Sequence, residues 1–246
     1  MAFVGNPIDV IKKLHQNKQW DDIVSFCQKM LADDQKDLVA LQNMATAFLN
    51  LERFDDVISC SEKVLEQNEF DEYATKNKIF ALERLGRHNE IISICDKMLT
   101  KNPLNTWILD SKGLALNELG QHDTALEYYD KSLNIEPNGV TALLNKAITL
   151  SFLQKHESAI PYYDRAQRLE KIPRAAAGKS AAYQKIGKSD EAFLAAQGLL
   201  DSEIEKIMLE ARTKKMKVFD YFCMIEYEDL EKREQKHQEK INSKLK

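Results

Sequence analysis

Apolar residues recur at helical spacing along this chain, and the stretch at residues 106–139 shows the pattern most clearly. Within it, Leu109 and Leu116 belong to a face whose members lie three and four residues apart, which predicts an amphipathic helix. Gly120 interrupts this pattern. A second amphipathic helix is expected after it and ends before Pro137, because proline cannot continue a helix. The stretch therefore predicts two helices joined by one tight turn.

This helical hairpin repeats along the chain with a fixed period. A leucine followed by a glycine occurs at positions 85–86 and again at positions 119–120. Their separation, about 34 residues, is typical of solenoids built from stacked repeats. Phasing the chain on the period gives six units, at residues 4–37, 38–71, 72–105, 106–139, 140–172 and 173–206. The position just before the turn is then occupied by Asn17, Leu51, Leu85, Leu119, Leu153 and Ile186.

Small residues occupy the places where the two helices of a unit touch. They are Gly113, Ala125 and Ser132 in the fourth unit, Ala147, Ala159 and Ala166 in the fifth, and Ser180 and Ala192 in the sixth. With Pro103 and Pro137 near the unit ends, the pattern resembles the tetratricopeptide repeat over roughly residues 4–206. The first three units depart from the family pattern by carrying larger residues where alanine is usual, namely Ile23, Val57 and Ile91. The resemblance implies an all-α fold, a right-handed α-solenoid superhelix of about six helix-turn-helix repeats.

The period stops after Asp201, and the remaining sequence predicts one or two long helices. We therefore divide the chain into six repeats over residues 1–206 and a C-terminal amphipathic helical extension over residues 207–246. A long helix that caps the last repeat is expected, because a repeat array needs such a cap for solubility. The extension is apolar nearly all round, so the alternative is a surface for a partner or for self-association. The candidate residues of that surface are Phe219, Phe222, Met224 and Tyr227.

The resemblance also implies that the first helix of each unit lines a concave groove. The candidate groove residues are Asn43, Thr46, Asn50, Tyr73, Lys76, Asn77, Phe80, Arg84, Trp107, Asp110, Ser111, Asn145 and Arg174. The asparagines form a polar row whose amides both donate and accept hydrogen bonds, which suits the backbone of an extended peptide. Tyr73, Phe80 and Trp107 supply apolar anchors in this interpretation. The alternative is that the amides brace adjacent helices and the aromatic side chains pack between repeats.

Some members of the family grip the terminal carboxylate of a chaperone tail with Lys, Asn and Arg side chains spread over three repeats. Only fragments of such a set occur here. Asn43 is followed by Tyr73 and Asn77 where Lys and Arg are needed. Leu114 replaces an Asn at a further position of the set. We therefore do not expect this chain to bind a chaperone tail in that way.

Acidic residues, histidines and cysteines recur at or near the turns. Each set would suggest a catalytic or metal-binding site, but structural roles explain them better. Acidic residues recur at the start of the second helices, at Asp21-Asp22, Asp55-Asp56, Glu90, Asp123, Glu157 and Asp190-Glu191. We expect them to cap these helices, because carboxylates accept hydrogen bonds from free backbone N–H groups and suit the positive helix end.

His88, His122 and His156 recur in successive units. Packed helices lie roughly 8–10 Å apart, which is too far for these histidines to share one metal ion. The cysteines at positions 27, 60 and 95 lie on second helices and are expected to be small buried residues.

Composition narrows the function further. The chain has 246 residues, a formal net charge of -4 and a pI of about 5.8. Because phosphate contacts supply most nucleic-acid affinity, this charge and the lack of a continuous basic stripe argue against nucleic-acid binding. The sequence shows no glycine-rich phosphate loop, no metal-spaced His/Cys set and no nucleophile elbow. We therefore expect no cofactor, no metal and no enzymatic activity.

The sequence thus predicts a non-catalytic protein–protein interaction module, an adaptor, scaffold or assembly factor that binds an unidentified protein or peptide segment in its groove. The alternatives are a helical-repeat nucleic-acid-binding protein and the substrate-recruiting arm of a separate enzyme. The first residues lack a secretory pattern, and no apolar run reaches the roughly 18 residues of a membrane span. A soluble cytoplasmic protein without membrane contact is therefore expected. Self-association through the C-terminal helix is kept as an alternative role of that helix.

Overall fold

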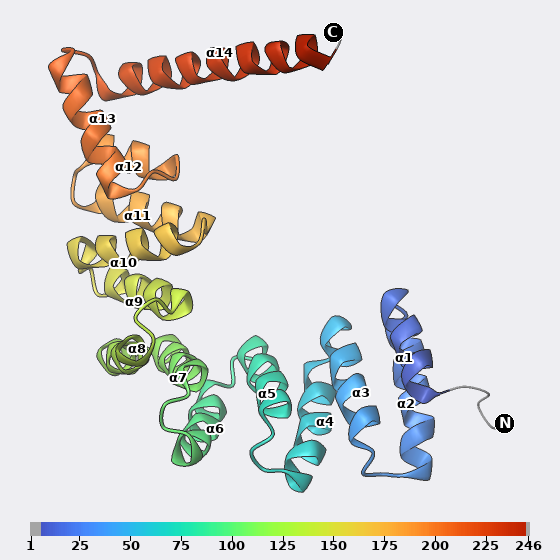
Figure 1. Ribbon diagram of the computed structural model, residues 1–246. Coiled ribbons are helices and arrows are strands. Elements are labelled where there is room, and N and C mark those ends of the chain that lie inside the picture. The colour runs from blue at the N-terminus through green and yellow to red at the C-terminus, as the bar shows by residue number, and fades with distance from the viewer. Residues whose placement is uncertain (1–5, 245–246) are drawn as a thin grey trace. The chain divides into compact units, whose positions relative to one another are not determined.

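The computed structural model describes the backbone of residues 6–244 and the side chains of residues 6–237. Residues 1–5 and 245–246, which belong to the expected first unit and to the C-terminal extension, lie outside the described residues. The described chain is α-helical and contains no strand (Figure 1). The all-α repeat solenoid predicted from the sequence is confirmed, and the right-handed superhelical twist stays a prediction.

The helices come in pairs that match the period of the sequence. The pairs are α1 (Pro7–Gln16) with α2 (Trp20–Asp33), α3 (Leu38–Asn50) with α4 (Phe54–Gln67), α5 (Glu72–Arg84) with α6 (His88–Lys101), α7 (Thr106–Glu118) with α8 (His122–Ile135), α9 (Val140–Phe152) with α10 (His156–Leu169), and α11 (Pro173–Lys185) with α12 (Ser189–Ala196). They are followed by α13 (Asp201–Thr213) and α14 (Val218–Lys244). The first member of each pair is called a first helix below, and the second member a second helix.

The turn inside each pair has the same backbone geometry. The second residue after each first helix has a positive φ, between 55° and 79°, and these residues are Lys18, Glu52, Gly86, Gly120, Gln154 and Gly187. The N–H of the next residue donates to a carbonyl five residues earlier, as Arg53 does to Phe48 and Arg87 to Leu82, both at 2.9 Å. This is the helix C-terminal motif that favours glycine. It explains why leucine–glycine recurs just before the second helices.

Helix capping differs from the sequence expectation. The residues preceding the second helices, Gln19, Arg53, Arg87, Lys155 and Lys188, cap no backbone N–H with their side chains. The acidic residues that were expected to cap lie inside the first turn, where they face the positive helix end. Two of them pair with the residue before the helix, Arg53 with Asp56 at 2.7 Å and Arg87 with Glu90 at 2.6 Å. The capping prediction is therefore wrong for these helices.

Side-chain caps occur at the first helices instead. Asp37, Asp71 and Asn105 occupy the same position in successive repeats, and each accepts a hydrogen bond from the backbone N–H three residues later. Asn6 caps α1 in a similar way. Because Asn and Asp are among the strongest N-cap residues, these caps fix where the first helices begin. They also fix which residues of those helices face the neighbouring repeats.

The chain divides into two compact units, unit 1 at residues 1–132 and unit 2 at residues 133–246. Within unit 1, α3 packs against α4 and also directly against α5, the next first helix. Within unit 2, α9 packs in the same way against α10 and α11. In the described residues, no packing of similar extent joins α4 to α6 or α10 to α12. First helices are therefore closer together than second helices, which supports the expectation that they lie on the inner side of each unit.

The small residues predicted at helix contacts are buried where expected. Ala125, Ala147 and Ala159 have no exposed surface. Gly113 lies so close to Tyr129 that a Cβ on the glycine would be 2.6 Å from the ring. Packing at this distance leaves room for no larger residue, because protein interiors are close-packed. In the first three repeats Ile23, Val57 and Ile91 are buried at the corresponding contacts, so these larger side chains are also part of the core.

The cysteines of the second helices belong to the core as well. Cys27, Cys60 and Cys95 are buried and free. Burial raises the pKa of the Cys27 and Cys95 thiols to about 12, and that of Cys60 to about 11. They are therefore neutral thiols that pack as small apolar residues, as predicted. Cys223 on α14 is free and exposed.

The end of the array departs from the period. The second helix α12 has 8 residues, whereas α10 has 14. Gly198, with a φ of 82°, follows it, and α13 begins at Asp201. The expected division between residues 206 and 207 therefore falls inside α13. The first part of α14 packs with α13 on α11 and α12, where Tyr183, Ile204 and Tyr221 are buried in one cluster, and this supports the expected capping role.

Among the described residues, no helix combines the length and the apolar run that a membrane span requires.

Candidate functional site

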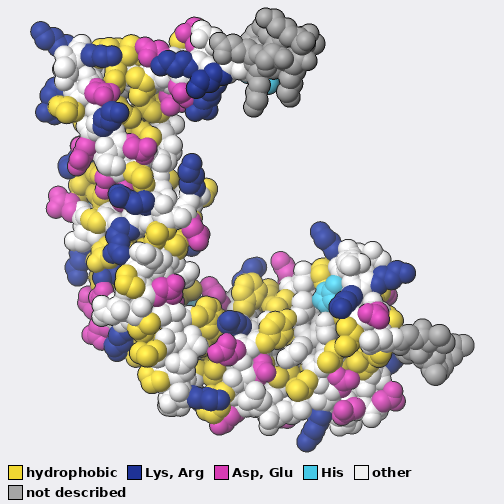
Figure 2. Space-filling view, viewed as in Figure 1, with side chains coloured by type: hydrophobic (Ala, Val, Ile, Leu, Met, Phe, Trp, Pro, Cys, Tyr) yellow, Lys and Arg dark blue, Asp and Glu magenta, His cyan; other side chains and the backbone are white. Residues whose placement is uncertain are grey.

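The first helices of unit 1 carry exposed aromatic side chains. Tyr73 and Phe80 lie on α5 and are each 45% exposed, and Trp107 on α7 is half-buried against the unit 1 core. Figure 2 shows hydrophobic side chains gathered at the surface over α5 and its neighbours. Exposed apolar side chains are informative where they are grouped, because contiguous apolar patches mark interaction surfaces. We call Tyr73, Phe80 and Trp107 the aromatic face.

Polar and charged groups hold this face in a defined arrangement. The Tyr73 hydroxyl lies 2.6 Å from the Thr46 hydroxyl on α3, which ties two first helices together. The ammonium of Lys76 lies 5.5 Å from the centre of the Trp107 ring, within the range of a cation–π contact. Arg84 lies over the ring of Phe54 at 5.2 Å. Tyr73 and Trp107 of this face are therefore held by other side chains of the chain itself.

The asparagine row splits between the two interpretations. Asn43 hydrogen-bonds through Oδ1 to Nε2 of His15 on α1, at 3.0 Å, and donates to the Val39 carbonyl at 2.7 Å. It therefore braces α1 against α3. Asn77 is buried, and its Nδ2 has no hydrogen-bond partner among the described residues. An amide left in this state costs free energy unless a partner satisfies it. Because this nitrogen is buried, Asn77 serves the groove interpretation only if its side chain turns outward.

The other candidate groove residues also differ in what they can offer. Ser111 donates to the Trp107 carbonyl at 2.9 Å, and Asn50 donates to the Thr46 carbonyl at 2.9 Å. Asp110 is buried. In unit 2, Asn145 is half-buried on α9 and Arg174 is exposed on α11. The structure thus brings together the candidates on α3, α5 and α7, while Asn145 and Arg174 belong to the other unit.

A ladder of lysines and acidic residues was missed in the sequence. A lysine of one first helix pairs with an acidic residue of the preceding second helix: Lys78 with Glu62 and Lys179 with Asp164, each at 2.7 Å, and Lys112 with Asp96. The lysines recur at positions 78, 112, 146 and 179, and the acidic residues at positions 62, 96, 130 and 164. This double periodicity was the available signal. The ladder joins consecutive repeats within each unit, so it positions the first helices.

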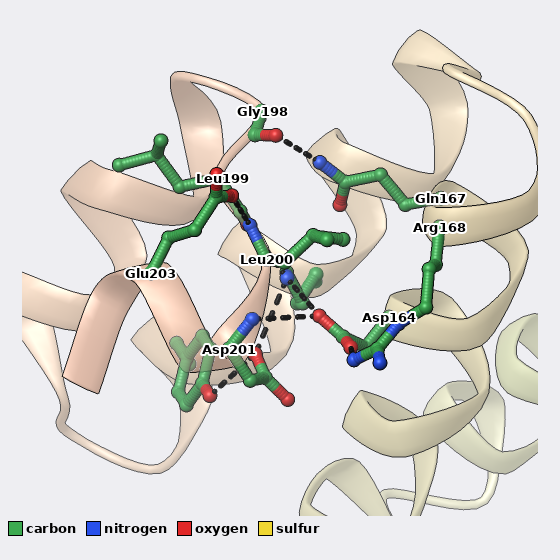
Figure 3. Close-up of polar contacts among 10 residues, drawn as sticks. Asp164, Gln167, Arg168, Gly198, Leu199, Leu200, Asp201 and Glu203 are labelled. Atoms are coloured by element: carbon green, nitrogen blue, oxygen red, sulfur yellow. Dashed lines mark hydrogen bonds and ion pairs between the residues drawn. The ribbon is translucent and has the colours of Figure 1, made fainter. Parts of the chain in front are cut away.

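The last pair of the ladder sits in a buried network in unit 2 (Figure 3). Oδ1 of Asp164 accepts from Lys179 Nζ and from the Asp201 backbone N–H at 2.8 Å, and Arg168 donates to Oδ2 at 3.0 Å. Lys179 Nζ also donates to the Leu199 carbonyl at 2.8 Å. Burial alone would raise the pKa of the Asp164 carboxyl, but these hydrogen bonds and the Lys179 charge more than offset it, so the pKa is lowered.

The network fixes the turn that follows the short helix α12. The Gln167 side chain donates to the Gly198 carbonyl, and the Glu203 carboxylate accepts from the Leu200 backbone N–H at 2.7 Å (Figure 3). The Tyr183 hydroxyl donates to Asp201 at 3.0 Å. These contacts attach the start of α13 to α10 and α11. Their role is structural, because among the buried side-chain polar atoms of these residues only Oε1 of Gln167 lacks a hydrogen-bond partner in the described chain.

The predicted C-terminal surface is only partly available. Phe222 packs edge-on against Phe193 of α12, with ring centres 5.5 Å apart, and Met224 is half-buried against the same cluster. Phe219 also packs against Phe193, with ring centres 5.2 Å apart, although more than half of its surface is exposed. Three of the four candidates therefore contact the end of the array, and Tyr227 is left on the surface.

The recurrent histidines lie at the first position of their second helices, as the period predicts. His122 hydrogen-bonds through Nδ1 to Asn117 at 2.8 Å. Within the described part of the chain, no group of three or more His, Cys, Asp or Glu side chains is arranged to hold a metal ion.

Two sequence profiles match the chain. The profile described as the N-terminal TPR repeats region of Psidin matches residues 58–150, and that of the tetratricopeptide repeat matches residues 140–172. No curated protein sequence matches.

Solved structures resemble the chain in fold. A tetratricopeptide repeat protein from Parabacteroides merdae is similar with a TM-score of 0.67 and 15% identity, over 77% of this chain and 75% of that one. PilW, a type IV pilus biogenesis factor, is similar with a TM-score of 0.66 and 18% identity, over 77% of this chain and 88% of its own. A thermophilic protein of the same kind from Thermus thermophilus is similar with a TM-score of 0.57 and 18% identity, over 72% of this chain and 99% of its own.

Proposed function

Because the chain is a tetratricopeptide repeat protein, we propose that it is a non-catalytic scaffold or adaptor that binds a segment of another protein. The binding surface is the aromatic face of unit 1, with the neighbouring first-helix residues Lys76, Asn77 and Arg84. The observation that carries the proposal is the 45% exposure of both Tyr73 and Phe80 on a helix that the chain already holds in place. Order before binding matters, because an ordered surface loses less entropy when a partner docks.

The chemistry of the face suits a polypeptide. Aromatic side chains supply most of the binding free energy at protein interfaces, since they bury large apolar areas with few rotamers to freeze. The buried Nδ2 of Asn77 is a hydrogen-bond donor without a partner in the described chain, and a rotation of this side chain toward the surface would let it donate to a backbone carbonyl of a bound segment. Lys76 and Arg84 are exposed beside the aromatic rings and favour acidic residues in that segment.

The comparisons add a modest argument for an assembly role. PilW is described as a pilus biogenesis factor, and its fold is similar to that of this chain. At 18% identity the likeness concerns the fold alone, so no pilus partner is carried over to this chain.

A cytoplasmic location belongs to the same proposal, because four free cysteines suit a reducing compartment.

The proposal is tested by capturing partners from an extract of the native cell with the immobilised chain and identifying them by mass spectrometry. Phe80→Asp is compared with Leu104→Asp, which alters an exposed leucine in the loop between α6 and α7. Removing a central aromatic anchor is expected to lower the affinity for a captured partner at least about tenfold. Leu104→Asp is expected to leave it unchanged.

Circular dichroism and thermal melting check that both variants fold. Equal capture by the wild type and Phe80→Asp would show that the aromatic face is not the binding surface. Equal loss in both variants would point to a non-specific effect of added negative charge and would also contradict the proposal.

A further inference from the structure

The distal part of α14 contacts nothing in the described chain. The packing of α14 on α12 and α13 ends at Ile225, and every residue from 226 to 237 is exposed. Isolated helices of this length are marginally stable in water. Tyr227 is 62% exposed and Leu230 is 54% exposed, and they lie three residues apart on one face of the helix. An exposed apolar pair on a helix that packs against no other part of the described chain is a contact surface for another molecule.

This helix is also strongly acidic over the same stretch. Residues 218–231 contain no Lys or Arg, and they contain Asp220, Glu226, Glu228, Asp229 and Glu231. The exposed apolar pair therefore lies on a stretch with an excess of negative charge, which ends at Lys232 and Arg233, and Arg233 pairs with Asp229 at 2.5 Å. Such a helix favours a surface that is apolar at its centre and basic at its edge.

The first helices of unit 2 offer a surface of that kind. Neither α9 nor α11 contains an Asp or Glu, whereas α11 carries Arg174 and Lys185 exposed. Between the two helices and α10 lies a hollow of about 260 Å³. Its lining includes Ile148, Phe152, Tyr163, Ala181 and Lys185.

Two details suit this hollow to an incoming aromatic or leucine side chain. Phe152 at its rim is 64% exposed. His156 also lines it, and the buried Nδ1 of that ring has no hydrogen-bond partner among the described residues. Because that nitrogen is shielded from solvent, the hydroxyl of a docked Tyr227 pairs with it only once the His156 ring turns toward the hollow.

We propose that α14 of one molecule docks through Tyr227 and Leu230 into the α9–α11 hollow of a second copy of this chain. The charge complementarity between the acidic helix and the acid-free basic surface selects this occupant. The two contacting surfaces are different, so the contact is heterologous and the chain assembles head to tail rather than as a closed two-fold dimer. The aromatic face of unit 1 takes no part, so this inference stands or falls independently of the proposed function.

The assembly is tested by sedimentation velocity over a range of concentrations, with three variants of exposed residues. The wild type is expected to form species that grow with concentration and that dissociate at high salt, since salt screens the charges at the rim. Leu230→Asp removes the docking helix face, and Phe152→Asp removes the hollow. Each variant alone is expected to be monomeric. Leu209→Asp, at an exposed leucine of α13 outside both surfaces, is the matched control and is expected to assemble like the wild type.

Mixing the two defective variants gives the decisive result. Leu230→Asp retains an intact hollow and Phe152→Asp retains an intact helix, so an equimolar mixture is expected to form a 1:1 dimer that grows no further. A charge exchange supports the same contact: Lys185→Glu is expected to weaken assembly at least about tenfold, and Glu231→Lys in the same chain is expected to restore it.

Three results would overturn the inference. The first is a wild-type chain that stays monomeric at the highest concentration, which means that the surfaces do not meet between molecules. The second is a Phe152→Asp variant that assembles like the wild type, which means that α14 binds elsewhere, for example to another α14. The third is the absence of a dimer in the mixture of the two variants.

Discussion

The ammonium group of Lys179 lies 2.7 Å from Oδ1 of Asp164, and the lysine side chain has no exposed surface. Lys78 forms the equivalent pair with Glu62 at the same distance, but there the Glu62 side chain is 53% exposed. One periodic contact therefore occurs at the surface in unit 1 and inside the core in unit 2. Since solvent screening separates the two cases, their contributions to stability are expected to differ widely.

Lys179→Met is expected to lower the free energy of unfolding by about 3–5 kcal/mol, because it leaves the Asp164 carboxylate buried without its main partner. The matched variant Lys78→Met removes a pair that is open to water and is expected to cost about 0–1 kcal/mol. Urea unfolding followed by circular dichroism measures both. Similar losses in the two variants would contradict the difference in burial between the pairs.

The same aspartate predicts a pH dependence of stability. Its pKa in the folded chain lies below the ordinary value of 3.8. A carboxyl whose pKa is lowered by folding stabilises the folded state at pH values above the unfolded-state pKa, and this stabilisation is lost as the pH falls through the folded-state pKa. Unit 2 is therefore expected to lose stability in acid, below about pH 4.

Asp164→Asn is expected to flatten this acid limb, because the amide does not titrate. The variant costs stability at neutral pH, so the slope against pH is the informative quantity rather than the absolute value. Equilibrium unfolding at a series of pH values measures it. An unchanged slope would show that Asp164 is not the titrating group.

Glycine substitutions test the turn inside the helix pairs. Gln154 adopts a φ of 59° at the position where Gly120 adopts 75°. A left-handed conformation costs a non-glycine residue about 1–2 kcal/mol, and glycine loses about 0.5–1 kcal/mol of backbone entropy. Gln154→Gly is therefore expected to raise the unfolding free energy by about 0.5–1 kcal/mol. Gly120→Ala is expected to lower it by a similar amount, and a melting series that gives both changes the same sign would refute this account of the turn.

Much of the fold follows from the period of the sequence. The position just before the turn of each unit, from Asn17 to Ile186, is the C-cap residue that directly follows each first helix. The period does not reveal whether an acidic residue is the N-cap of a helix or lies in its first turn, because the two positions differ by only two or three residues. Asp37 and Asp71 were overlooked for that reason. The short helix α12 was also not predicted, since Gly198 resembles an ordinary turn residue.

The candidate site was less predictable than the fold. The aromatic positions on α5 could be placed from the resemblance to the tetratricopeptide repeat, which implies the helix face that lines the groove. The roles of Asn43 and Asn77 could not, since they depend on whether His15 or another group lies within hydrogen-bonding distance. The lysine ladder was missed because its partners are distant in sequence and lie on different repeats. Searching for two charges that recur with the same period would have found it.

The central claim is that a protein segment binds on the first-helix side of the repeats. It is tested most directly by placing a photoreactive amino acid at position 80 on α5 or at position 59 on α4, where Phe80 and Ser59 are both exposed. After irradiation in an extract of the native cell, the account predicts a cross-linked partner from position 80 and none from position 59. Cross-linking from position 59 with none from position 80 would place recognition on the second helices and contradict it.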